Sequence, residues 1–316
     1  MDRNSKILVA GARGLVGSAV VRRLKVDGYH NLLTPTRAEV DLTDQSAINR
    51  YLARKQPEYV FLVAGKVGGI YANSTFPADF IRDNILIQAL VIDAAHKFGV
   101  RKLLDVGSSC IYPKFAPQPM TEDCLLTSAL EPSNEWYAIA KITGLKMCQA
   151  FHRQYGFTAI SLMPTNLYGP GDNFDLKTSH VLPAMLRKFH DAKETGASEV
   201  VLWGTGTPRR EFLYVDDLAD ACLFAMLNYD GEQFLNVGTS QDLPIRELAE
   251  LVAQTVGFTG RTTWDTSMPD GTPRKLLDGS RLNSMGWKAK TSLSDGIRLT
   301  YRWFLENESV KQSKEE

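Results

Sequence analysis

The chain has 316 residues, enough to bury a large core in one domain or in two lobes around a cleft. Hydrophobic residues make up 44% and charged residues 23%, which excludes the disordered, fibrous and membrane-spanning classes. The 36 basic side chains balance 36 acidic ones, so nucleic-acid and membrane-surface partners have no electrostatic support. No apolar run approaches the ~18–20 residues of a membrane span, and the first residues read as a strand rather than a signal peptide. We therefore expect a cytoplasmic protein.

The four cysteines stand at irregular spacings, without a Cys-x-x-Cys pair. Neither a disulfide framework nor a zinc site is indicated by this pattern. We expect free thiols and no metal at Cys110, Cys124, Cys148 and Cys222.

Apolar runs of strand length alternate with amphipathic segments of helix length through the first half of the chain. The expected strands cover residues 6–10, 31–34, 59–64, 102–107 and 159–164. The expected helices cover residues 15–27, 44–55, 78–98 and 137–155. This alternation predicts an α/β fold with a doubly wound parallel sheet, as in the Rossmann fold.

After residue 165 the pattern loosens into loops rich in glycine and proline, with shorter helices at 216–227 and 245–256. Residues 234–238 read as one more buried strand that returns to the first sheet. We therefore expect a nucleotide-binding domain over residues 1–168, with a return at about 212–240, and a smaller C-terminal lobe over 169–316. The polar residues 306–316 are expected to be disordered.

A glycine-rich loop follows the first expected strand and opens the first expected helix. It consists of Gly11, Ala12, Arg13, Gly14, Leu15, Val16 and Gly17. Glycines at these places allow a tight turn and close approach of the backbone to a pyrophosphate, and the helix N-terminus supplies amide donors. The order of strand, loop, helix and second strand predicts a dinucleotide site.

The residue after the second strand indicates which nicotinamide is bound. Twenty residues past Gly17, where an NAD-binding protein would place an acidic residue on the ribose, stands Arg37. With Arg13 in the loop, two guanidinium groups suit a 2′-phosphate, so NADP(H) is favoured over NAD. The alternative, two solvated surface arginines, remains open, and Glu39 lies nearby.

Tyr137 and Lys141 lie four residues apart on one helix face. Tyr51 and Lys55 have the same spacing, but only Tyr137 follows a strand end that leads into a polar loop with Ser108. A phenol ionises near pH 10, so it exchanges protons at neutral pH only if a cation favours phenolate. We expect Lys141 to have this effect on Tyr137, with Ser108 beside them.

The glycine loop, Ser108 and the Tyr-x-x-x-Lys pair resemble the extended short-chain dehydrogenase/reductase family of nucleotide-sugar enzymes. The resemblance covers roughly residues 6–305, and its most specific motifs lie at residues 65–70, 107–113, 163–170, 173–180, 203–212 and 269–275. These motifs are similar to those of the members that convert GDP-4-keto-6-deoxy-D-mannose to GDP-L-fucose, by inversion at C3 and C5 and NADPH-dependent reduction at C4. The resemblance therefore implies an oxidoreductase and epimerase, with a GDP-sugar as its partner.

The resemblance also implies roles for individual residues. Tyr137, Lys141 and Ser108 would act in the reduction, and Cys110 and His180 would be the base and acid of the epimerisation. The cofactor would contact the glycine loop, Lys141, His180 and a set at the strand ends, namely Arg37, Asp41, Leu42, Val106, Gly107, Ser108, Ser109, Pro164, Thr165, Asn166 and Leu167. GDP would contact Lys188, Trp203, Arg210 and Asp270, and a homodimer would form through residues 78–98 and 137–155.

Other readings share parts of this pattern. A 4,6-dehydratase or C4-epimerase would keep the Tyr–Lys pair, but dehydratases of the family have Asp-Glu where this chain has Cys110 and Ile111. A non-catalytic NADP-binding sensor would be expected to lose the Tyr–Lys pair. By itself, Cys110 could be a small buried thiol and His180 a helix cap.

Overall fold

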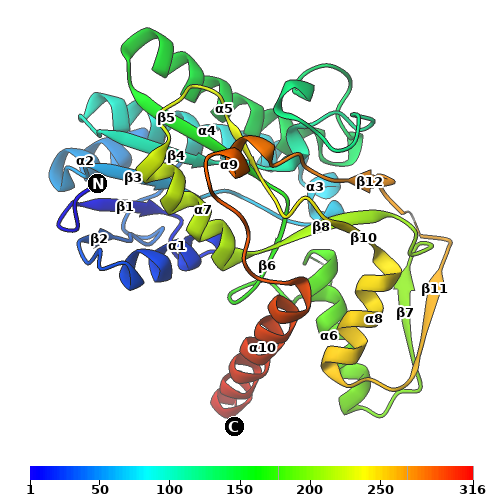
Figure 1. Ribbon diagram of the computed structural model, residues 1–316. Helices are drawn as coiled ribbons and strands as arrows, with labels where there is room; N and C mark the ends of the chain where they lie inside the picture. The colour runs from blue at the N-terminus through cyan, green and yellow to red at the C-terminus, as the bar shows by residue number, and fades with distance from the viewer. Residues whose placement is uncertain (177, 269, 316) are drawn as a thin grey trace.

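The computed structural model describes residues 1–176, 178–268 and 270–315. In this part of the chain a six-stranded parallel sheet has the order β2-β1-β3-β4-β5-β9 (Figure 1). Its strands are β1 (Ile7–Ala10), β2 (Leu32–Leu33), β3 (Tyr59–Leu62), β4 (Lys102–Val106), β5 (Thr158–Pro164) and β9 (Leu235–Val237). β2 and β3 lie on opposite sides of β1, so the order reverses there, and ligands bind at the carboxyl ends of strands at such a point.

Helices cover both faces of this sheet. One face packs against α1 (Leu15–Val26) and α7 (Val215–Asn228), and the other against α2 (Gln45–Lys55), α4 (Pro77–Lys97) and α5 (Glu135–Tyr155). Because successive side chains of a strand point to opposite faces, Leu104 of β4 joins the first core and Leu103 the second. The predicted doubly wound fold is confirmed.

The return of the chain to the first sheet is also confirmed. β9 pairs in parallel with the end of β5, with Leu235 opposite Leu162. Both residues are almost fully buried in the core that lies against α1 and α7. The chain thus leaves the sheet after β5, builds part of a second lobe, and comes back before completing it.

The second lobe combines short strands with three longer helices, lower right in Figure 1. β8 (Arg209–Tyr214) pairs with β6 (Asn166–Tyr168), β10 (Asp242–Pro244) and β12 (Arg274–Lys275), and β7 (Glu199–Trp203) pairs with β11 (Arg261–Asp265). α6 (Val181–Glu194), α8 (Ile245–Val256) and α10 (Leu293–Glu315) enclose a separate core around Leu186, Phe189 and Val252. Short helices complete the chain, namely α3 (Ile70–Thr75), α9 (Ser280–Ser284) and the 3₁₀ turns η1 (Ser109–Ile111), η2 (Glu122–Cys124) and η3 (Pro132–Asn134).

The C-terminal segment corrects one expectation. α10 continues through the polar residues as far as Glu315, where the composition of residues 306–316 predicts disorder; residue 316 lies outside the described residues. Extending a helix that already exists requires no new nucleation, and this segment has neither proline nor glycine to stop it. None of the helices described is long and apolar enough to cross a membrane.

Candidate active site

The glycine loop passes over the carboxyl ends of β1 and β3. Gly11 has a φ of 94°, and a Cβ there would lie 2.7 Å from the backbone of Ala64. A Cβ on Gly17 would overlap the carbonyl group of Gly11, so the turn leaves no room for a side chain at either place. Gly14 is the N-cap of α1, and it has no side chain to cap the amide groups of that first turn. The loop therefore offers free backbone donors to an anion.

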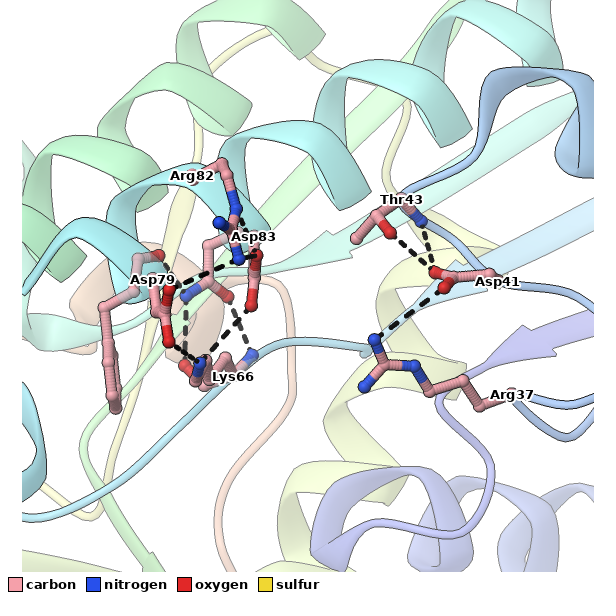
Figure 2. A network of polar contacts seen from close by, with 9 residues as sticks. Arg37, Asp41, Thr43, Lys66, Asp79, Arg82 and Asp83 are labelled. Carbon is pink, nitrogen blue, oxygen red and sulfur yellow. Dashed lines mark hydrogen bonds and ion pairs between the residues drawn. The ribbon is translucent and has the colours of Figure 1, made fainter. Parts of the chain in front are cut away.

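Arg37 and Arg13 lie beside the segment that follows β2. Figure 2 shows Arg37 next to Asp41, with 3.7 Å between Nη2 and Oδ2, and 85% of the arginine side chain is exposed. Asp41 accepts hydrogen bonds from the backbone and hydroxyl of Thr43, which lower its pKa. Two hydrogen bonds from Thr36 lower the pKa of Glu39, and the charge of Arg13 adds to this. Both guanidinium groups thus flank one short loop and remain accessible.

A charged network fixes the loop after β3 to α4. Lys66 Nζ lies 3.0 Å from Asp79 and 3.4 Å from Asp83, and Arg82 binds both carboxylates (Figure 2). The buried amide of Asn84 donates to the Lys66 carbonyl and accepts from its N–H, each at 3.0 Å. These contacts with α4 therefore fix the position of the loop at the carboxyl ends of the strands.

The first two turns of α5 bring Tyr137 and Lys141 to the end of β4. Lys141 is 4% exposed, and its Nζ donates to the Val106 carbonyl at 3.0 Å and lies 5.9 Å from the centroid of the Tyr137 ring. The Ser108 hydroxyl hydrogen-bonds to Tyr137. Ser108, which helix spacing could not connect to the other two residues, is thus a neighbour of Tyr137.

The predicted effect of Lys141 on Tyr137 is wrong in this structure. Burial raises the pKa of Tyr137 well above its usual range, and negative charge on Cys110 or Asp105 acts in the same direction. The hydrogen bond from Ser108 lowers the pKa but does not offset burial. Burial also lowers the pKa of Lys141, while the charge of Asp105 opposes this shift. Tyr137 therefore keeps its proton at neutral pH.

Asp105 on β4 is a buried carboxyl group that the sequence analysis did not identify. It is fully buried, and neither carboxylate oxygen has a hydrogen-bond partner among the described residues. Burial raises its pKa to about 6, although the charge of Lys141 opposes the shift. Burial thus makes ionisation of Asp105 unfavourable, although Lys141 of the Tyr137–Lys141 pair acts on this carboxyl group.

Replacing Asp105 with Asn should stabilise the fold in a pH-dependent way. Below about pH 4 the carboxyl is protonated in both folded and unfolded chains, and the burial penalty grows as the pH rises to about 6. A two-unit rise in pKa corresponds to about 3 kcal/mol above that range. Urea unfolding at pH 8 and pH 4.5 should show the Asn variant gaining more stability over wild type at pH 8, about 3 kcal/mol, than at pH 4.5, about 1 kcal/mol. An equal difference at both pH values would contradict the prediction.

Lys275 contacts Cys110, and its charge also acts on His180. Cys110 lies in η1 and is half-buried; Asn134 Nδ2 lies 3.4 Å and Lys275 Nζ 3.7 Å from its Sγ. His180 is the N-cap of α6, yet its side chain makes no capping hydrogen bond. Partial burial lowers the pKa of His180, and the positive charge of Lys275 lowers it further. Cys110 differs from Cys148 and Cys222, which are fully enclosed thiols.

The four residues expected to bind GDP form two contacts in the second lobe. Lys188 Nζ donates to the Val201 carbonyl at 3.1 Å and lies 5.7 Å from the Trp203 ring, which is 62% exposed. Asp270 accepts from the backbone and hydroxyl of Thr205. Burial lowers the pKa of Arg210, while Asp270 beside it opposes the shift. Residues 177 and 269, which belong to two of the resembling motifs, lie outside the described residues.

Glu211 joins the two lobes beside the expected cofactor residues of β5 and β6. Its carbonyl accepts from Thr165 at 3.3 Å and from Asn166 at 2.8 Å. Its fully buried carboxylate accepts from three backbone N–H groups, those of Thr239, Ser240 and Leu277. Glu211 therefore sets the position of β12 and with it Lys275. Sequence reasoning had placed both residues in motifs but had no means of assigning them a contact.

Of the remaining expected cofactor residues, Gly107 and Ser109 are buried beside β4, and Leu42, Pro164 and Leu167 lie at strand ends or in the loop after β2. The described residues include no group of His, Cys, Asp and Glu able to hold a metal ion, and the four cysteines are free thiols.

Comparison with known proteins connects this geometry to a family. A model described as the NAD dependent epimerase/dehydratase family matches residues 7–238. GDP-L-fucose synthase 1 of Arabidopsis thaliana is 60% identical over 306 residues, covering 97% of this chain and 95% of its own length. GDP-L-fucose synthase of Escherichia coli K12 is 51% identical, with 96% and 97% covered. A GDP-L-fucose synthetase from Naegleria fowleri bound to NADP has a TM-score of 0.90 at 29% identity, with 98% and 96% covered. The chain belongs to the NAD dependent epimerase/dehydratase family.

Proposed function

We propose that this protein converts GDP-4-keto-6-deoxy-D-mannose to GDP-L-fucose, inverting C3 and C5 and then reducing the C4 ketone with NADPH. The observation that carries the proposal is that Cys110, which contacts Lys275, acts on Tyr137 beside Ser108, while the charge of Lys275 also acts on His180. A reductase without epimerase activity would need Tyr137 and Ser108 but not Cys110 and His180. The printed names of relatives that cover nearly the whole chain support the same reaction.

The residues of the first lobe fit NADP(H). The tight turn at Gly11 and Gly17 places the backbone close to the first turn of α1, whose amide groups would supply donors to a pyrophosphate. Arg37 and Arg13 supply planar cations for a 2′-phosphate. When bound, the reduced nicotinamide supplies the hydride for the ketone.

Tyr137 and Ser108 are proposed to act on the C4 oxygen. A phenol that keeps its proton at neutral pH can donate that proton as the ketone is reduced. The Ser108 hydroxyl can donate a hydrogen bond to the same oxygen and stabilise negative charge during epimerisation. Lys141 donates a hydrogen bond to the Val106 carbonyl, and this contact keeps its ammonium group near the Tyr137 ring.

Cys110 and His180 are proposed to exchange protons at C3 and C5. The ketone acidifies the hydrogens on both flanking carbons, so a base can remove one and leave an enolate. Inversion requires that the new proton arrive on the opposite face. A thiolate and an imidazolium are both able to exchange protons near neutral pH, which suits them to this pair of steps.

Lys188, Trp203, Arg210 and Asp270 are proposed to hold GDP. The cations suit the diphosphate, the exposed indole offers a surface for packing, and the carboxylate can accept from hydroxyl or amine groups. Lys188 offers a positive charge to the diphosphate but not the bidentate geometry of an arginine.

Two alternative functions have less support. A 4,6-dehydratase would need an acidic pair after Ser109, but Ile111, one of the two residues there, is fully buried and apolar. An NADP-binding sensor would have no need for the Tyr137–Lys141 pair. Mixing the protein with GDP-4-keto-6-deoxy-D-mannose and NADPH and following nicotinamide absorbance tests the proposal; no oxidation of NADPH would reject it.

Arg37→Ala should weaken NADPH binding by roughly 1–3 kcal/mol and leave NADH binding nearly unchanged, because only NADPH has the 2′-phosphate. Titration calorimetry with both nucleotides measures the two dissociation constants. Arg50→Ala, an exposed arginine on α2, is the matched control and should change neither. Equal losses for both nucleotides in Arg37→Ala would contradict the assignment.

We also propose that the protein forms a homodimer through α4 and α5 and acts in the cytoplasm. Ile85 and Leu86 on α4 are only half-buried, which leaves apolar surface for a second copy. Light scattering after size exclusion measures the mass, and cell fractionation tests the location.

A further inference from the structure

Lys275 is held in place by a short segment of the second lobe. It lies on β12, where it pairs in parallel with Arg210 of β8. The two residues that follow it donate backbone hydrogen bonds, Leu276 to Gln118 Oε1 at 2.8 Å and Leu277 to Glu211 Oε2 at 3.0 Å. Hydrogen bonds to Gln118 of the first lobe and Glu211 of the second lobe therefore fix the backbone next to the half-buried Lys275 side chain.

The environment of Lys275 differs from that of the cations expected to bind the diphosphate. Lys188 contacts the Val201 carbonyl and Arg210 lies beside Asp270, whereas Lys275 Nζ lies 3.7 Å from Cys110 Sγ. Among the described residues, Tyr137 of α5 is influenced by Cys110, and His180 at the start of α6 by Lys275. The group that Lys275 contacts is thus Cys110, the proposed base of the epimerisation.

The positive charge of Lys275 acts on the sulfur that it contacts. An ammonium group beside a sulfur stabilises the thiolate, the form that can remove a proton from carbon. Lys275 therefore favours Cys110 as a base.

From the contact of Lys275 Nζ with Cys110 Sγ, we infer that Lys275 is a positioning residue that favours the thiolate of Cys110 and so makes Cys110 the base of the epimerisation. The inference rests on the proposed function, because it assigns directions to a proton exchange which that function requires. Lys275 itself need not touch the sugar.

The test compares Lys275→Met, which removes the charge, with Lys275→Arg, which keeps it, and with Lys193→Met on the exposed end of α6 as control. The rate of Cys110 alkylation by iodoacetamide is followed from pH 6 to pH 10 by mass spectrometry of the Cys110 peptide. In Lys275→Met the midpoint of this profile should rise by about one pH unit or more. Lys275→Arg and Lys193→Met should keep the midpoint of wild type.

Deuterium exchange from solvent into GDP-4-keto-6-deoxy-D-mannose is measured with the same proteins at pH 7. Lys275→Met should lose about 10-fold or more in exchange and recover part of it at higher pH. An unshifted alkylation profile in a Lys275→Met protein that unfolds at the wild-type temperature overturns the role of Lys275. Absence of exchange in wild type overturns the proposed function instead. If Lys275→Met does not fold, Lys275→Gln provides the same comparison.

Discussion

Replacing Tyr137 with Phe should lower the rate of ketone reduction by about 10²–10⁴-fold, the usual effect of removing a positioned general acid. The ring should stay in place, because it packs edge-on against Phe80 at a centroid distance of 6.3 Å and Phe keeps that contact. Cofactor affinity and thermal stability should therefore change little. NADPH oxidation under single-turnover conditions measures the loss in the chemical step.

The chain provides a matched control for this variant. Tyr51 on α2 has a lysine four residues later, as Tyr137 does, but it packs against the core between α2 and the sheet. Tyr51→Phe should reduce the ketone at nearly the wild-type rate. If the two variants behaved alike, the assignment of Tyr137 as proton donor would be wrong.

Cys110→Ser should abolish the uptake of solvent deuterium at C3 and C5, because a hydroxyl ionises too weakly near neutral pH to remove these protons. Serine has almost the same size, so Asn134 can still donate to residue 110 and the loop should keep its shape. Slow reduction of the ketone that has not been epimerised should continue and yield a 6-deoxy-mannose product. NMR of the isolated sugar nucleotides measures both results.

His180→Gln should give a different pattern in the same experiment. Cys110 should still remove protons from C3 and C5, so some uptake of solvent deuterium should remain. The new proton should not be delivered on the opposite face of the sugar, so GDP-L-fucose should not accumulate. The substitution should not disturb α6 through its cap, because the His180 side chain makes no capping hydrogen bond. Full wild-type exchange in Cys110→Ser would show that Cys110 is not the base.

The first half of the fold could be predicted because each element has its own sequence pattern. α2 begins one residue after Asp44, whose carboxylate accepts from Ala47 N–H, and α5 ends where Gly156 adopts a left-handed conformation. The strands of the second lobe had no such pattern. β12 has two residues and β10 three, and their position depends on β8 rather than on their own residues.

The candidate site could be predicted only as far as local spacing and family motifs allowed. The spacing of Tyr137 and Lys141 placed both on one helix face, but the raised pKa of the phenol depends on burial, which helix spacing does not show. Lys275 lies 165 residues from Cys110, so only the folded chain shows that they touch. Asp105 reads as one residue within an apolar strand until its buried, unpartnered oxygens are seen.

The return of β9 to the first sheet has a consequence for protein engineering. A chimera that takes its first 168 residues from one relative and the remainder from another would pair β5 and β9 from different parents. The α1–α7 layer would be mixed in the same way, since α7 packs on α1 from beyond that point. To transfer specificity for a different sugar nucleotide, the second-lobe segments before residue 215 and after residue 237 should therefore be exchanged separately. Residues 215–237 should come from the same parent as the first lobe. A single crossover would combine a new binding surface with a mismatched core.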